Sequence, residues 1–130
     1  MSVTRTFTVT VVSTGGGNKY FIDGVQQPTL ELVEGATFRF DQSDSTNGTH
    51  PLRFATAADA SGGTQYTTNV TTNGTPGSSG AYTQIEVASG APTLYYYCTN
   101  HSGMGGQANT PNSDFWGAGN WSANLWGIEE

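Results

Sequence analysis

Cysteine is nearly absent from this sequence of 130 residues, which contains one cysteine, two histidines and two methionines. A single cysteine excludes a disulfide within the chain. A chain of this length can bury a sizeable core without such a cross-link. The lone thiol is therefore a buried apolar residue, a nucleophile or a metal ligand.

Positive charge is also scarce. Four Lys and Arg residues stand against ten Asp and Glu residues, which gives a net charge of −6. Nucleic-acid phosphates and anionic membrane surfaces both attract basic patches. The composition therefore argues against nucleic acid and against a membrane surface as partners.

Long apolar runs are missing as well, and no stretch approaches the length of a membrane-spanning helix. The N-terminus, MSVTRTFTVTVV, has a polar start and no small-residue cleavage site, so it does not resemble a signal peptide. We expect the chain to act where it is made, in the cytoplasm or on a virion. If a leader has been removed, a periplasmic or thylakoid-type location is expected instead.

The pattern of apolar residues has a period of two and no helical repeat. Phe7, Val9 and Val11 alternate with threonines, as in a half-buried strand. Further strands are expected at residues 19–22, 29–33, 36–41, 50–55, 65–71, 82–87 and 92–98, the last of the series. Seven to eight short strands separated by turn signals predict an all-β fold, a sandwich or a barrel, with negligible helix in residues 3–106.

The C-terminal residues differ in composition from the rest of the chain. Trp116, Trp121 and Trp126 recur every five residues, which fits neither a strand nor a helix. We therefore divide the chain into a domain at residues 1–110 and a Trp/Gly-rich tail at residues 111–130. The tail either packs on the domain, lies partly disordered, or is an interaction segment, because exposed tryptophans often anchor interfaces.

The stretch YYYCTNHSGMGG, residues 95–106, places Cys98, His101 and Met104 at C-x2-H-x2-M spacing. Thiolate, imidazole and thioether are soft or borderline ligands, and together they suit copper. Copper electron-transfer sites combine two histidines and one cysteine in a plane with a distant axial methionine. The other histidine, His50, completes this set, so the sequence predicts one copper ion bound by His50, Cys98, His101 and Met104.

The surroundings of these residues fit a rigid site. Gly103, Gly105 and Gly106 are expected to let the loop turn back tightly, because glycine accepts positive φ angles. Pro51 is expected to fix the backbone just after His50.

Three alternatives remain open at this level. A structural zinc site normally has four cysteine or histidine ligands, and this chain offers three. A cysteine nucleophile would pair with a histidine base, and Asn100 lies nearby, but no strand-to-helix elbow is apparent. The chain can also bind no metal, because a lone buried cysteine or methionine is usually part of a core.

These residues resemble the cupredoxins, the family of small type 1 (blue) copper proteins that includes plastocyanin and amicyanin. The aromatic run before Cys98, the short C-x2-H-x2-M loop and the separation of His50 from Cys98 carry the resemblance, which covers residues 3–106 in pattern. It implies a Greek-key β-sandwich and a type 1 copper site. Small family members often have Asn directly after the first histidine, where it helps to lock the ligand loops. Here Pro51 occupies that place, so we expect the stiffening to come from elsewhere.

Two functions follow from this resemblance. The first is a mobile electron carrier, in which redox protein partners dock briefly on a weakly apolar face around His101, with Pro51, Leu52, Gly103 and Gly105. The second is a cupredoxin-like structural or binding module of a larger virion or surface assembly, as in modules of bacterial and phage proteins, with copper absent or only stabilising. Enzymatic activity is not expected, because one copper with all its ligand positions filled has no open site for a substrate.

Overall fold

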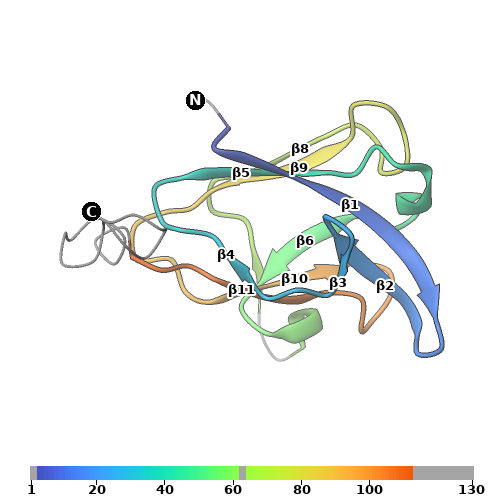
Figure 1. Ribbon diagram of the computed structural model, residues 1–130. Coiled ribbons are helices and arrows are strands. Elements are labelled where there is room, and N and C mark those ends of the chain that lie inside the picture. Colours follow the sequence, from blue (N-terminus) through green and yellow to red (C-terminus); the bar gives the residue numbers. More distant parts are fainter. Residues whose placement is uncertain (1–2, 62–63, 113–130) are drawn as a thin grey trace.

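The computed structural model describes residues 3–61 and 64–112, which form short strands and two single-turn 3-10 helices (Figure 1). The helices are η1 (Ser45–Asn47) and η2 (Ala58–Ala60). In this part of the chain no helix is long and apolar enough to cross a membrane. The strands are β1 (Arg5–Thr14), β2 (Gly17–Ile22), β3 (Val25–Gln26), β4 (Leu30–Glu31), β5 (Thr37–Asp41), β6 (Leu52–Ala55), β7 (Gln65–Tyr66), β8 (Val70–Asn73), β9 (Tyr82–Glu86), β10 (Leu94–Cys98) and β11 (Gly106–Asn109).

The strands form two mixed sheets. One has the order β3-β2-β1-β5-β9-β8, and the other has the order β4-β11-β10-β6-β7. Most neighbours are antiparallel, but β1 runs parallel to β5 and β11 runs parallel to β4. The all-β prediction and the near absence of helix are confirmed for the described residues.

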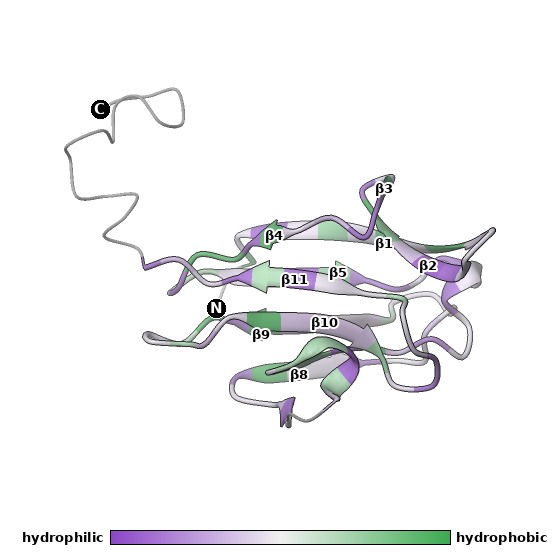
Figure 2. Ribbon diagram, turned by 90° about the horizontal axis from the view of Figure 1, so that it is seen from below, coloured by the Kyte–Doolittle hydropathy of each residue, from purple (hydrophilic) through white to green (hydrophobic). Residues whose placement is uncertain are grey.

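The two sheets share one hydrophobic core, as in a β-sandwich. Phe40 of β5 meets Phe54 of β6 edge to face, with 5.4 Å between ring centroids, and Tyr20 of β2 lies 6.5 Å from Tyr96 of β10. These contacts join the inner faces of the two sheets. In Figure 2, hydrophobic segments are visible on β4 and β11, which belong to the same sheet.

The alternation read from the sequence places the core residues correctly. Phe7, Val9 and Val11 of β1 are buried, as are Leu94, Tyr96 and Cys98 of β10. Tyr97, on the opposite face of β10, is also buried. Because both faces of a central strand can be covered, strict alternation does not predict burial there.

The predicted number of strands is wrong. The described residues contain eleven strands rather than seven to eight, and β10 is not the last of them. The segment expected as one strand at 65–71 is divided into β7 and β8, which pair in different sheets. Strand β11, with the sequence GQAN, follows the loop of residues 99–105, which contains His101 and Met104 and is called the ligand loop below. Only one side chain of β11 is buried, that of Ala108. Backbone pairing with β10 and β4 makes this segment a strand, and its side chains show no alternation of apolar and polar residues that would predict one.

The predicted tail at residues 111–130 lies outside the described residues from residue 113 onward, with all three of its tryptophans. Residues just before residue 113 contact the sandwich. The Thr110 hydroxyl donates to the carbonyls of Ala91 and Pro92, and the carbonyl of Pro111 accepts the Glu34 N–H at 3.0 Å.

Thr37 of β5 offers a test of the core. Its hydroxyl is buried and has no hydrogen-bond partner among the described residues. We expect Thr37→Val, which keeps the side-chain shape, to raise the free energy of unfolding by about 1 kcal/mol, because it removes an unsatisfied polar group. Chemical denaturation measures this change.

The matched control is the same substitution at Thr83 of β9, which is equally buried but donates to the Leu52 carbonyl at 2.9 Å. Thr83→Val is expected to lower the free energy of unfolding by about 1 kcal/mol. Equal losses of stability in both variants would show that the Thr37 hydroxyl has a partner in solution.

Candidate metal centre

Three potential ligands converge at one end of the two sheets. Cys98 is the last residue of β10, and its side chain points inward because it shares the buried face of Leu94 and Tyr96. Cys98 lies opposite Leu52 of β6 in the antiparallel register. His50 lies two residues before the first residue of β6, so this pairing brings His50 beside Cys98. His101 follows three residues after Cys98 in the loop to β11.

The distances between these groups suit one metal ion. The Cys98 Sγ atom lies 3.7 Å from His50 Nδ1 and 3.6 Å from His101 Nδ1. The three ligand atoms all lie within 4.8 Å of one another. An ion about 2.3 Å from a sulfur and about 2.0 Å from a nitrogen holds those two atoms roughly 3.5 to 3.7 Å apart when the angle between the two bonds is about 110° to 120°. The observed spacing therefore matches what a single bound ion needs.

Hydrogen bonds among the three side chains explain this arrangement less well than a shared metal ion does. Both imidazoles direct Nδ1 at the same sulfur, and a thiol has only one proton to donate. At most one of the two contacts can be an S–H···N hydrogen bond, while the other histidine would have to donate to sulfur, which is a weak acceptor. Shared coordination satisfies both nitrogens and the sulfur at once.

The protein places the three ligands at different depths. Cys98 and His50 are buried, whereas His101 is exposed, and the two imidazole centroids are 4.6 Å apart. Burial, and to a smaller extent the neighbouring His101, lowers the pKa of His50. A neutral imidazole has the free lone pair that a metal requires, so this environment favours the form of His50 that can bind.

Met104 lies in the same core cluster as Cys98 and is 1% exposed. Its carbonyl accepts the N–H of Tyr20 at 2.9 Å, which ties the end of the ligand loop to β2. Its side chain is therefore shielded from water. Met104 shares the hydrophobic core cluster with Cys98 and Tyr20, and its role as a fourth ligand stays a prediction.

A buried polar network holds the backbone of His50. The His50 carbonyl accepts hydrogen bonds from the Tyr20 hydroxyl and from Gln42 Nε2, each at 2.7 Å. Gln42 Oε1 also accepts the Leu52 N–H at 2.9 Å, so this side chain bridges both flanks of Pro51. Burial, followed by the charge of Cys98, raises the pKa of Tyr20 far above its usual range, so Tyr20 remains a donor.

Part of the prediction for the glycines is wrong. Gly103 has a positive φ of 76°, as expected, but Gly105 and Gly106 do not adopt positive φ values. They are required because the backbone passes close to β10. A Cβ on Gly105 would lie 1.7 Å from the Tyr96 carbonyl oxygen, and one on Gly106 would lie 2.9 Å from the Tyr96 hydroxyl.

The expected docking face also needs a correction. Leu52 is fully buried, because it lies on the inner face of β6, and it cannot contribute to a surface. Pro51, Gly103 and Gly105 are half-buried, and His101 is exposed. The exposed surface around His101 is therefore formed mainly by polar residues of its own loop, Thr99, Asn100 and Ser102.

Sequence reasoning missed the residues that support the ligands. Gln42 and Asn47 bond to the backbone of His50, and Asp59 bonds to that of Gly103, but each lies in a polar stretch with no recognisable motif. Buried Asn47 donates to the Val9 carbonyl at 2.8 Å and so ties η1 to β1. Only their positions in the folded chain reveal these roles.

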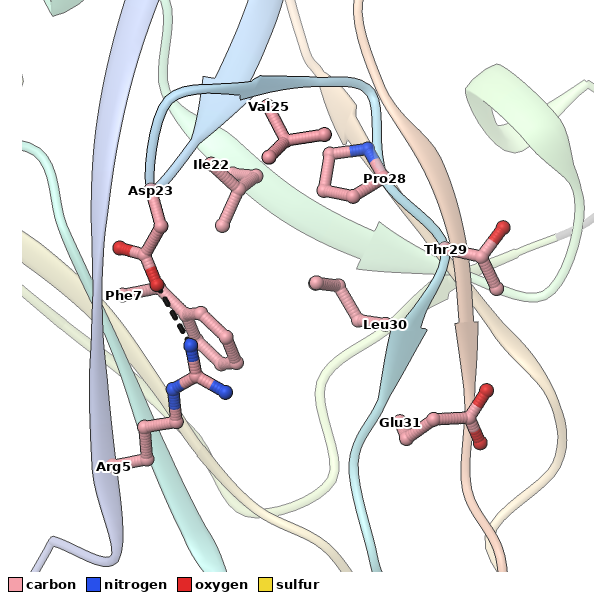
Figure 3. A pocket seen from close by; sticks show the side chains of 9 residues that line it. All are labelled: Arg5, Phe7, Ile22, Asp23, Val25, Pro28, Thr29, Leu30 and Glu31. Carbon is pink, nitrogen blue, oxygen red and sulfur yellow. Dashed lines mark hydrogen bonds and ion pairs between the residues drawn. The ribbon is translucent and has the colours of Figure 1, made fainter.

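A separate groove of about 340 Å³ lies between β1, the β2–β3 turn and β4 (Figure 3). Its one ion pair joins Arg5 to Asp23 at 2.8 Å, and the Arg5 guanidinium also lies 4.3 Å from the centroid of the Phe7 ring. None of its lining residues is a predicted metal ligand. Arg5 and Asp23 pair with each other, and the Glu31 carboxylate accepts from Asn109 at 2.8 Å, so the groove offers no centre comparable to the His/Cys/His cluster.

No protein-family model matches the chain, and the search of curated proteins found no match. The class of this protein therefore follows from its fold and its cluster: over the described residues it is an all-β protein of two mixed sheets with a His/Cys/His group that could hold a metal ion.

Proposed function

We propose that this protein is a cupredoxin-like copper protein that carries single electrons between protein partners. The observation that carries the proposal is the convergence of His50, Cys98 and His101, with sulfur-to-nitrogen distances of 3.7 and 3.6 Å. The thiolate and two imidazoles favour copper among the first-row metals, and Met104 supplies the soft fourth donor. The proposal includes a Greek-key arrangement of the two sheets.

The depths of the ligands support electron transfer. When bound, copper supplies a one-electron couple between Cu(I) and Cu(II). Cys98 and His50 shield the centre from solvent, while His101 is exposed and gives partners a short path to it. Partners of this kind dock through small, transient interfaces. The hydrogen bonds on both flanks of the ligands limit their movement when the charge of the site changes.

The test is a titration of the metal-free protein with Cu(II), followed by absorption spectroscopy in the visible range. We expect one equivalent to bind and an intense blue or green band from thiolate-to-copper charge transfer. Electron exchange between oxidised and reduced copies, measured by NMR line broadening, should be fast. A coloured protein that exchanges no faster than an inaccessible copper, or a colourless one, would favour a structural module of a larger assembly.

Met104→Leu tests the axial donor. Both side chains are apolar and similar in size, so the fold should be maintained at a cost under about 1.5 kcal/mol. We expect copper to remain bound and the reduction potential to rise, because loss of a weak donor favours Cu(I). Cyclic voltammetry measures this shift. An unchanged potential would show that Met104 is not a ligand.

A further inference from the structure

Gly103 lies between His101 and Met104 in the ligand loop. Side chains from distant parts of the sequence bind both its backbone N–H and its backbone carbonyl. The Gly103 N–H donates to both carboxylate oxygens of Asp59, at 3.1 and 3.0 Å. The Gly103 carbonyl accepts from Lys19 Nζ at 2.9 Å and from Gln27 Nε2 at 3.0 Å.

These contacts fill a gap in the backbone hydrogen bonding of the ligand loop. At one end of the loop the Thr99 N–H reaches the Pro51 carbonyl, and at the other the Met104 carbonyl accepts the Tyr20 N–H. Gly103 lies between these two points, after β10 has ended and before β11 begins. Side chains hold it there, from segments 44 to 84 residues away in the sequence.

The backbone of η2 is strained where it presents this carboxylate. Asp59 and Ala60 have φ values of 54° and 60°, two consecutive non-glycine residues in the left-handed region. Residues with a side chain rarely adopt this conformation, because Cβ then comes too close to the following carbonyl oxygen, although aspartate tolerates it better than most. Strain of this kind persists where the surrounding structure imposes it, often at functional sites. Here it directs the Asp59 carboxylate at Gly103.

We propose that Asp59, assisted by Lys19 and Gln27, is a positioning residue that holds the ligand loop in its metal-binding conformation before a metal ion arrives. This inference rests on the proposed copper function for its purpose, although the anchoring itself can be measured without metal. The proposal explains what stiffens the ligand loop in a chain that has Pro51, and not Asn, directly after His50. Side chains outside the loop take that part.

Two substitutions separate the carboxylate from the backbone strain. Asp59→Gly removes both acceptors and also relieves the left-handed backbone, since glycine adopts it freely. Asp59→Asn keeps one acceptor oxygen and also tolerates this backbone. The first measurement is amide hydrogen exchange of Gly103 in the metal-free protein. We expect exchange at least about tenfold faster in Asp59→Gly, because a hydrogen bond to a charged group is lost, and a largely restored rate in Asp59→Asn.

Asp23→Gly is the matched control. Asp23 also has a left-handed backbone, with φ of 52°, and its carboxylate also accepts a backbone N–H, that of Thr8 at 2.8 Å. Its hydrogen bonds and its ion pair go to Arg5 and Thr8 and not to the ligand loop, so Asp23→Gly should leave the exchange rate of the Gly103 amide unchanged. An equal acceleration in this control would overturn the proposal, because general destabilisation would then explain the effect.

The second measurement uses the copper-loaded protein. We expect Asp59→Gly to release copper to a chelator about tenfold faster and to alter the relative intensities of the charge-transfer bands, with Asp59→Asn close to the parent. Unchanged Gly103 exchange in Asp59→Gly overturns the proposal, as does faster exchange with unchanged copper release and spectrum. The unsubstituted protein can also fail to bind copper while Asp59→Gly still accelerates hydrogen exchange of the Gly103 amide. In that case the proposed copper function fails, but the role of Asp59 in holding Gly103 is supported.

Discussion

Cys98→Ser is expected to abolish the thiolate-to-copper band and to weaken Cu(II) binding by at least about 100-fold. A hydroxyl stays protonated and is a hard donor, so it cannot replace the soft thiolate. Loss of an outer-shell partner alone typically lowers metal affinity 10- to 100-fold, and a lost ligand should cost no less. Absorption spectroscopy and competition with a chelator measure both effects.

The substitution also buries a hydroxyl, because Cys98 is 3% exposed. Ala108→Ser is a suitable control, since Ala108 of β11 is fully buried in the same sheet and binds no metal in the proposal. It should lose stability by roughly 1–3 kcal/mol and keep its colour. A Cys98→Ser protein that remains coloured would exclude Cys98 as the ligand and remove the basis of the proposed site.

Gly105→Ala is expected to destabilise the metal-free protein by roughly 3 kcal/mol or more. The added Cβ would lie 1.7 Å from the Tyr96 carbonyl oxygen and 2.6 Å from the carbonyl carbon. Both are backbone atoms of a central strand, so no rotamer change can relieve the clash, and overpacking of this severity exceeds the usual cost. Denaturant-induced unfolding measures the loss.

Gly15→Ala provides the control for this variant. A Cβ on Gly15 would meet no atom within 4 Å, and its φ is not positive. Its effect should stay within about 0.5 kcal/mol. If both variants unfold at the same denaturant concentration, the close approach of residue 105 to β10 does not exist in solution.

The candidate site could be predicted because its residue types are rare. With one cysteine and two histidines in the chain, the spacing around Cys98 left His50 as the only further imidazole, and the structure brings these three groups together. The strands with alternating apolar residues, such as β1 and β10, could be predicted for a similar reason, because a buried face requires that pattern.

Features that depend on tertiary partners could not be predicted. The sequence of β11 has one apolar side chain to bury, and its neighbours in the sheet define it as a strand. Asp59 lies in a polar excursion where nothing marks it as the partner of Gly103. The sequence shows that Gly105 has no Cβ, but only the fold shows which backbone atoms occupy that space.

The register of the sheets has a consequence for the order in which the molecule assembles. Strand β1 pairs with β2 through a tight hairpin, but its parallel pairing with β5 and the approach of Cys98 to His50, 48 residues away, require long segments to be ordered first. Pairings between distant segments form slowly, commonly in milliseconds to seconds. The only thiol therefore stays open to oxidation until β6 and β10 have paired, and a reducing environment during refolding should raise the yield of protein able to bind metal.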